Sequence, residues 1–316
     1  MKNRDRGQVA KASRHQGYRG RAFVFCFLVL LFGAVLAGCG VQTSTHYYYY
    51  SPSWARDGKL IYLGATESVN RDILGGQLSS NYAEYTMTIY PSGTGESGAL
   101  FDTTSARPYE MTCSPTTDYV AYGDSLRSGL YRRVVLRNIA AGTHTGLEQL
   151  ELAFSPGIKS FDWSNDGIKL VYCTSTEIHT VDINGDNDTL VVADSNLEFV
   201  AWKYGGRIAF VRTSGADKIL SLIYADGSGR TDLAAASSVD LPQISSTNTD
   251  EVYGVVGSTY KKVVVSSRVR SDLIASFTGE FPRLSPDTTL LTYSKSTETT
   301  GIYLYDLSAG TETQVK

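Results

Sequence analysis

One stretch of the sequence decides the fold class: Trp163-Ser-Asn-Asp166-Gly167-Ile-Lys-Leu-Val-Tyr172, followed by Glu177-Ile-His-Thr-Val-Asp-Ile-Asn184-Gly185. In its first half, an Asp-Gly turn precedes a run of apolar and aromatic residues that favours a β-strand. Its second half alternates apolar and polar side chains and ends in Asn-Gly, which tolerates the positive φ of a tight hairpin turn. The stretch therefore predicts antiparallel strands joined by short turns.

The pattern of this stretch occurs six times along the chain. Each copy starts with an apolar residue directly before a turn rich in Ser, Asp, Gly or Pro. These first residues are Trp54, Cys113, Trp163, Trp202, Ile244 and Leu284. An aromatic residue follows eight or nine positions later in every copy, at Tyr62, Tyr122, Tyr172, Phe210, Tyr253 and Tyr293. The copies are spaced by 59, 50, 39, 42 and 40 residues. Self-similarity at this period indicates a repeated supersecondary unit.

A second pair of strands with its own turn is expected in each unit. Five such turns are recognisable, at Ser92-Gly93, Ala141-Gly142, Asn184-Gly185, Asp226-Gly227 and Ala309-Gly310. The fifth unit departs from the pattern over Lys261 to Phe277, and the first has a long predicted loop from Gly64 to Glu84. Four strands per unit predict an all-β fold over residues 51–316, a six-bladed β-propeller of four-stranded antiparallel blades. A pair of β-sandwiches is the alternative, but it does not account for six aligned aromatic residues.

The repeats resemble the WD40-like repeat of the TolB propeller family. The resemblance rests on residues 163–185, on Phe281-Pro-Arg-Leu-Ser-Pro-Asp287 and on Ser51-Pro-Ser-Trp-Ala-Arg-Asp-Gly-Lys59, and it covers nearly all of residues 51–316. It implies the fold but no single activity, because such repeats occur in scaffolds, peptidase propellers and lyases. TolB proper is a soluble periplasmic protein with an additional N-terminal α/β domain. About a dozen residues separate Cys39 from the first repeat here, so the family's partnership with the peptidoglycan-associated lipoprotein is not implied.

The N-terminus has the pattern of an export signal. Residues 1–21 are basic and polar, and Ala22 to Ala37 are almost wholly apolar. Sixteen helical residues span about 24 Å, which is shorter than the bilayer core of about 30 Å. Together these features predict a secretory signal peptide.

The end of the signal, Leu36-Ala37-Gly38-Cys39, resembles the bacterial lipobox. The resemblance implies a lipoprotein signal peptide over residues 1–38, acylation of Cys39 and a lipidated tether over residues 39–50. Several acyl chains would anchor the protein stably in a membrane. An uncleaved membrane anchor is the alternative, and both place the later residues outside the cytoplasm. Gly40 favours the outer membrane if the cell has two.

The charge of the chain excludes one class of partner. The whole chain has a formal net charge of −3, and removal of the basic first 38 residues leaves −9. Nucleic-acid binding needs a basic face, so no nucleic-acid partner is expected. Cys113 and Cys173 remain after processing and acylation. In an exported protein they could form a disulfide or stay as two buried thiols.

Sequence patterns for metal or cofactor binding are weak. Alternating oxygen ligands at Asp182, Asn184, Asp186 and Asp188 make a weak Ca²⁺ candidate, although an EF-hand needs Gly where Asn187 stands and Glu where Ala193 stands. A plain turn is the alternative. The glycines of 93–98 match a dinucleotide fingerprint by letters, but no helix is predicted after them. No catalytic constellation, other metal site or cofactor is expected.

The sequence contains two candidate binding surfaces. The run His46-Tyr-Tyr-Tyr-Tyr50 is either an aromatic patch or a strand. On the predicted strand order, one face of the propeller collects charged residues that form a candidate partner-binding rim: Glu67, Arg71, Asp72, Arg107, Glu110, Lys159, Glu198, Asp240, Glu280 and Arg283.

The sequence favours a non-enzymatic, lipid-anchored binding scaffold of the cell envelope. Its partner would be an envelope protein or glycan, and a monomer is expected. The alternative is a propeller-type envelope enzyme, such as a polysaccharide lyase, with its site at the central channel.

Overall fold

The computed structural model describes residues 42–71, 77–90, 108–125, 132–138, 152–153, 157–202, 206–236, 239–244, 248–295 and 301–315. The regular elements of these ranges are all strands. Within them, no helix is long and apolar enough to cross a membrane. The predicted signal peptide and Cys39 lie outside the described residues.

Five antiparallel sheets of four strands each follow one another along the chain, and each sheet is built from consecutive strands. We call them blades B to F. Blade B contains β4 (Pro108–Cys113), β5 (Tyr119–Ser125), β6 (Arg132–Asn138) and β7 (Leu152–Ala153), and blade C contains β8 (Ser160–Trp163), β9 (Lys169–Cys173), β10 (Glu177–Asp182) and β11 (Thr189–Ala193). Blade D contains β12 (Leu197–Ala201), β13 (Arg207–Ser214), β14 (Asp217–Tyr224) and β15 (Thr231–Ala236), and blade E contains β16 (Val239–Ile244), β17 (Glu251–Val256), β18 (Thr259–Val264) and β19 (Arg270–Ile274). Blade F contains β20 (Glu280–Leu284), β21 (Leu290–Lys295), β22 (Gly301–Asp306) and β23 (Thr311–Gln314).

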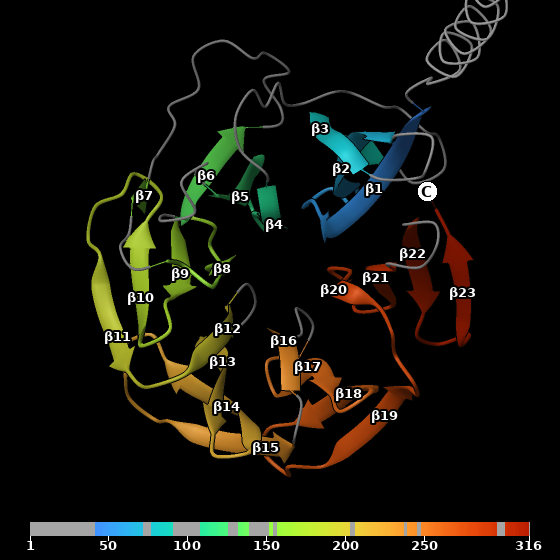
Figure 1. Cartoon of the computed structure of the whole chain (residues 1–316). Coiled ribbons are helices and arrows are strands. Elements are labelled where there is room, and N and C mark those ends of the chain that lie inside the picture. Colours follow the sequence, from blue (N-terminus) through green and yellow to red (C-terminus); the bar gives the residue numbers. More distant parts are fainter. Residues whose placement is uncertain are drawn as a thin grey trace, which may run out of the picture. The chain divides into compact units, whose positions relative to one another are not determined.

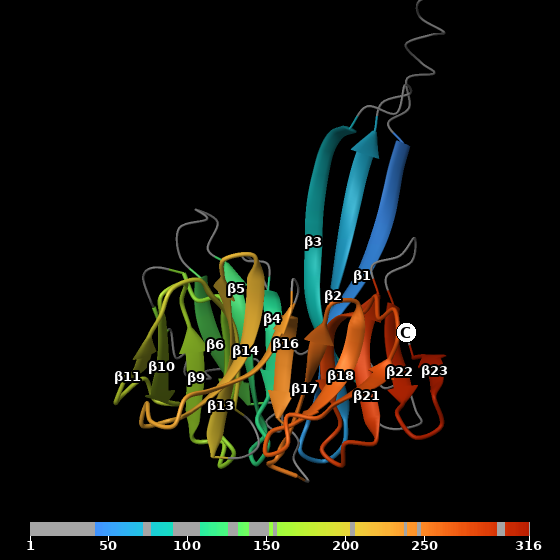
Figure 2. The same cartoon turned by 90° about the horizontal axis from the view of Figure 1, so that it is seen from below.

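The prediction of six four-stranded blades is wrong, because the described residues form five sheets of four strands and one sheet of three. The first sheet, sheet A, has the order β1 (Gln42–Trp54), β2 (Leu60–Arg71) and β3 (Gln77–Tyr90), and Figure 2 shows its long strands side by side. The predicted loop from Gly64 to Glu84 is mostly strand. Its Thr, Val and Tyr residues favour extended backbone, so they lengthen β2 and β3 instead of leaving the sheet. The predicted turn at Ser92-Gly93 lies outside the described residues.

The chain divides into two compact units. The smaller unit is Met1–Thr45 with Ser68–Asn81, and its described residues are end segments of β1, β2 and β3. The larger unit is His46–Glu67 with Tyr82–Lys316, and it contains the rest of sheet A and all five blades. In this larger unit the sheets are arranged around a common centre (Figure 1).

Hydrophobic clusters between successive sheets hold the larger unit together. Each repeat aromatic lies on the second strand of its sheet, and the six are at most 6% exposed. Tyr172, for example, packs with Trp163 of its own blade and with Ala121 and Leu136 of blade B. The last cluster joins Trp54 and Tyr62 of sheet A to Ile302 of blade F, so the ring of sheets closes. All six aromatic residues of the repeat are therefore buried between neighbouring sheets.

The turns that follow the innermost strands also interlock. Arg56 donates two hydrogen bonds to the carboxylate of Asp118 in blade B, at 3.0 and 3.1 Å. The Thr116 hydroxyl donates to the carbonyl of Asp166 at 2.7 Å. Gly167, with φ +69°, lies so close to this contact that a Cβ would come within 2.3 Å of Thr116 Oγ1. Glycine is therefore required at position 167 both by the turn and by the neighbouring blade.

Two alternatives left open by the sequence can be compared with the structure. The run from His46 to Tyr50 lies in β1, so the predicted strand is confirmed, and the aromatic patch stays a prediction. Cys113 and Cys173 are free thiols, and both are buried. Burial raises the pKa of the Cys173 thiol well above its usual value, so this thiol stays protonated and packs as a small apolar side chain.

Candidate binding site

The innermost strands of all six sheets converge on the centre of the larger unit. Around a small central cavity of about 30 Å³ lie Ser53, Trp54, Thr112, Asp162, Val200, Ala201, Pro242, Gln243, Arg283 and Leu284. This volume corresponds to about one water molecule. In the part of the chain that the structure describes, the central cavity is therefore too small to hold a sugar ring or a peptide.

Side chains of one inner strand accept hydrogen bonds from the backbone of the next and thereby close the centre. The N–H groups of Met111 and Cys113 donate to the hydroxyls of Ser51 and Ser53 at 2.8 and 3.0 Å. The inner strands of neighbouring sheets do not pair through their backbones. The serine hydroxyls therefore accept the hydrogen bonds of N–H groups that would otherwise need a backbone carbonyl of a paired strand.

Hydrogen bonds from a backbone N–H to a side chain of the neighbouring inner strand also join the other sheets. Asp162 accepts from the Trp202 N–H at 3.1 Å and from the Thr112 hydroxyl at 3.0 Å, and thus joins three sheets. The Gln243 side chain accepts from the Leu284 N–H at 2.6 Å. The polar side chains at the centre are therefore hydrogen-bonded between sheets.

One ion pair lies in this centre. Arg283 Nη2 is 3.3 Å from Glu110 Oε1, and the side chains are only 15% and 6% exposed. Ser160 also donates to Glu110, at 3.3 Å. Burial raises the pKa of the Glu110 carboxyl to about 7, and the nearby Asp162 carboxylate adds to the rise, whereas Arg283 and Ser160 lower it. This carboxyl therefore titrates near neutral pH.

The residues of the predicted rim are distributed over several places. Lys159, Glu198, Asp240 and Glu280 lie at or beside the starts of β8, β12, β16 and β20. Glu198 is paired with Lys218 at 2.6 Å, which lowers its pKa against the opposing effect of burial. Glu67 lies within β2 and Arg71 at its end, whereas Asp72 and Arg107 lie outside the described residues. Of the ten, Glu110 and Arg283 form the described ion pair.

The weak Ca²⁺ candidate forms the turn between β10 and β11, and its side chains bind protein groups. Asp182 accepts from Lys169 at 2.5 Å and from Asn187 at 2.6 Å. Asp188 accepts from the Tyr172 hydroxyl at 2.8 Å and contacts His179 Nδ1 at 3.0 Å. No group of three or more His, Cys, Asp or Glu side chains that could hold a metal occurs in the described ranges.

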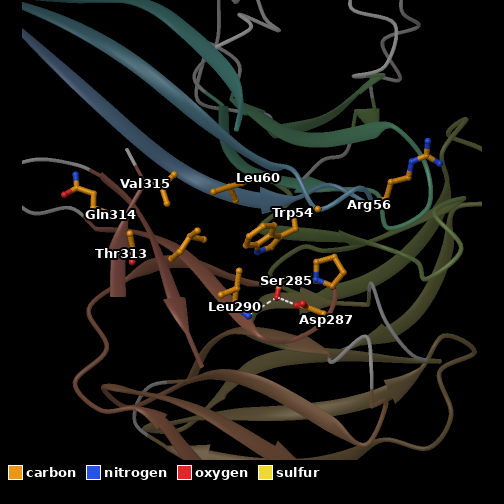
Figure 3. A pocket seen from close by; sticks show the side chains of 12 residues that line it. Trp54, Arg56, Leu60, Ser285, Asp287, Leu290, Thr313, Gln314 and Val315 are labelled. Atoms are coloured by element: carbon orange, nitrogen blue, oxygen red, sulfur yellow. Dashed lines mark hydrogen bonds between the residues drawn. The ribbon is translucent and has the colours of Figure 1, made fainter. Parts of the chain in front are cut away.

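A larger cavity opens at the seam between sheet A and blade F. Its volume is about 620 Å³, within the range of ligand pockets. We call it the seam pocket; it is lined by Trp54, Arg56, Gly58, Leu60, Ser285, Pro286, Asp287, Leu290, Leu304, Thr313, Gln314 and Val315. Figure 3 shows Trp54, Leu60 and Leu290 around its middle, with Thr313, Gln314 and Val315 at one side.

The walls of the seam pocket are fixed by interactions on both sides. Trp54 donates its indole N–H to the Arg283 carbonyl at 3.2 Å, which holds the ring at the seam. Asp287 accepts from the hydroxyls of Ser285 and Thr289 at 2.5 and 2.9 Å. The hydrogen bond from Ser285 contributes most to lowering the pKa of Asp287, so the carboxylate is ionised at neutral pH. The pocket thus combines an apolar floor with one anionic group.

Known structures share this architecture at low sequence identity. TolB from Acinetobacter baumannii aligns with a TM-score of 0.60 and 11% identity, covering 85% of this chain and 78% of that one. The larger unit has a TolB-like propeller fold. An oligogalacturonate lyase from Vibrio parahaemolyticus aligns with a TM-score of 0.53 and 12% identity over 84% of this chain and 91% of its own. A chain of the nidogen/laminin complex gives a TM-score of 0.54 and 11% identity over 85% and 92%.

These similarities establish the fold and do not separate a binding function from catalysis, because TolB and lyase propellers are comparably distant. No protein-family model matches the sequence. No curated protein matches it either.

Neither the side chains that bridge the inner strands at the centre nor the seam pocket was predicted from the sequence. The bridging residues do have a signal, because Ser53, Thr112 and Asp162 each directly precede the first residue of a repeat. A polar residue at that position faces the next inner strand. The seam pocket has no such signal, since Leu60 and Val315 meet only after the ring closes.

Proposed function

We propose that this chain is a lipid-anchored binding scaffold of the cell envelope, exported by its signal peptide and held to a membrane through Cys39. Its TolB-like propeller would present surfaces to an envelope protein or polymer. The observation that carries the proposal is the use of the central side chains: Asp162 and Gln243 bridge inner strands, and about 30 Å³ is left between them.

An enzyme site at the central channel would need room for a substrate beside a free acid or base. Glu110 has a pKa of about 7, in the range of a general acid or base, but it is bound by Arg283 and Ser160 and is 5% exposed. The larger, apolar cavity is at the seam, and Glu110 does not line it. Binding through surface features is therefore the better-supported function.

The proposal can be tested with the full-length protein purified in detergent. We expect specific capture of an envelope component, and no turnover of envelope glycans or peptides with or without added divalent cations. The Asp162→Asn and Glu110→Gln variants distinguish the two functions, because they alter the central carboxylates alone. Turnover by the wild-type protein that both variants lose would overturn the scaffold proposal in favour of an enzyme.

A further inference from the structure

The seam pocket is a cavity to which the scaffold function assigns no ligand. Its volume is about 620 Å³. For comparison, an apolar cavity of about 150 Å³ inside a protein holds a benzene ring. The seam pocket therefore has room for an organic molecule larger than one ring, whereas the central cavity of about 30 Å³ does not.

The floor of the pocket is apolar and held in place. Trp54 and Leu60 are 8% and 2% exposed and belong to the hydrophobic cluster between sheet A and blade F, against which Leu290 and Leu304 pack. The indole N–H of Trp54 is bound to the Arg283 carbonyl, so the polar group of this side chain needs no ligand. A preformed apolar floor favours an apolar molecule, because little has to be ordered when it binds.

One charge in the lining is not neutralised by a neighbour. The Asp287 carboxylate accepts hydrogen bonds from the Ser285 hydroxyl and from the hydroxyl and N–H of Thr289, all at Oδ1. In the described part of the chain, no hydrogen bond ends on Oδ2, and no Lys, Arg or His forms an ion pair with this carboxylate. Asp287 is exposed, so Oδ2 is open to a ligand.

The positive charge in the lining is already compensated. Nε and Nη2 of Arg56 donate to the Asp118 carboxylate, and Nη1 donates to the Thr116 carbonyl at 3.1 Å. Figure 3 shows this guanidinium pointing away from Trp54. The charge that remains in the pocket is that of Asp287, which is complementary to a cation and unfavourable for an anion.

We infer that the seam pocket binds a small organic cation, an amphiphilic amine whose apolar body lies against Trp54 and the leucine side chains and whose ammonium group lies beside Asp287. The apolar body supplies most of the affinity. The charge supplies a preference of roughly two- to fivefold, because Asp287 is exposed to water. This inference goes beyond the scaffold function and does not depend on it.

The test uses the full-length protein in detergent and three photoreactive probes with one apolar skeleton. Each probe is an aryl trifluoromethyl-diazirine, and the three bear an aminomethyl, a hydroxymethyl or a carboxylate group. On irradiation the diazirine loses N₂, and the resulting carbene inserts into a neighbouring bond of the protein. Mass spectrometry of proteolytic peptides locates and quantifies the label, which separates binding in the pocket from uptake of the probe by micelles.

Two pairs of variants test the body and the charge separately. Thr313→Trp obstructs the pocket from an exposed position of its lining, and Thr311→Trp places the same bulk on the same strand outside that lining. Asp287→Asn keeps the Oδ1 acceptor of the turn and removes the charge. Asp306→Asn is its control, because Asp306 also accepts three hydrogen bonds at Oδ1 in a turn of blade F and does not line the pocket. Thermal melting of all four variants checks that they are folded.

In the wild type, the aminomethyl probe should label residues 54–60 and 285–290 roughly two- to fivefold more than the hydroxymethyl probe, and the carboxylate probe should label them least. Thr313→Trp should reduce this labelling roughly tenfold or more, because the apolar body loses its contacts. Asp287→Asn should make the aminomethyl and hydroxymethyl probes label equally. Thr311→Trp and Asp306→Asn should behave like the wild type.

Two kinds of result would overturn the inference. Labelling of these segments that persists in Thr313→Trp, or labelling found only elsewhere in the chain, would show that the pocket is not the site. Equal labelling by the aminomethyl and hydroxymethyl probes in the wild type, or a preference for the amine that Asp287→Asn retains, would show that the site does not select a cation.

Discussion

At the scale of single residues, the most unusual group is the carboxyl of Glu110. It lies on an inner strand, almost without solvent, and its ion-pair partner Arg283 comes from a position 173 residues later in the chain. Such a group links proton binding to folding, because its folded pKa of about 7 differs from the ordinary value of 4.5.

The sign of this linkage gives the first prediction. Between about pH 4.5 and 7 the folded protein retains a proton that the unfolded chain has lost. The free energy of unfolding should therefore fall as pH rises through this window. Glu110→Gln, which keeps an oxygen acceptor for Arg283, should remove that part of the slope. Denaturant unfolding at intervals between about pH 5 and 8 measures it.

Glu280→Gln is a suitable control, because Glu280 begins β20 and is exposed. It should retain the wild-type dependence on pH. An unchanged slope in Glu110→Gln would show that another group is responsible.

At the scale of elements, the contacts between inner strands take the place of a continuous sheet. Ser53 is fully buried, and its hydroxyl accepts from the Cys113 N–H at 3.0 Å. Ser53→Ala should remove this buried hydrogen bond and lower the free energy of unfolding by about 1–3 kcal/mol. Ser308→Ala, on an exposed turn, should change it by less than about 0.5 kcal/mol. A loss of similar size in both variants would mean that the bridge contributes nothing specific.

The strands themselves were largely predictable. An aromatic residue eight or nine positions after the first residue of each repeat, such as Tyr172 or Phe210, marks a position that is buried between sheets, so the period of the repeat follows from packing. The first unit was predicted wrongly because residues 64–84 contain Gly and Ser that resemble a loop, while their Thr, Val and Tyr allow strands as well. Whether such a segment forms a loop or a strand depends on pairing with a neighbouring strand, and the local sequence does not reveal that pairing.

The candidate site was less predictable than the strands. Charged residues are usually solvated, so Glu110 and Arg283 were assigned to an exposed rim. Their burial depends on two inner strands meeting at the centre, which is a property of the closed ring. The seam pocket likewise depends on the first and last sheets becoming neighbours.

At the scale of the whole molecule, anchoring is the property with the clearest test. If Cys39 carries acyl chains, the wild-type protein should incorporate a fatty-acid analogue and fractionate with membranes. Cys39→Ala should do neither, because the lipid attachment site is gone. Cys26→Ala, in the apolar run of the signal, should label like the wild type. Equal labelling of Cys39→Ala would contradict the lipoprotein prediction.

The assignment of each sheet to one continuous stretch of chain has a consequence for evolution. No described strand pairs outside its own sheet, and the joints between sheets are made by side chains and by the interlocking turns. A gene duplication or deletion that covers one unit of about 40 residues would add or remove a blade without rerouting any strand. The flanking units would meet through the same kind of bond from a polar side chain to a backbone N–H, so propellers with different numbers of blades can descend from one ancestor in single steps.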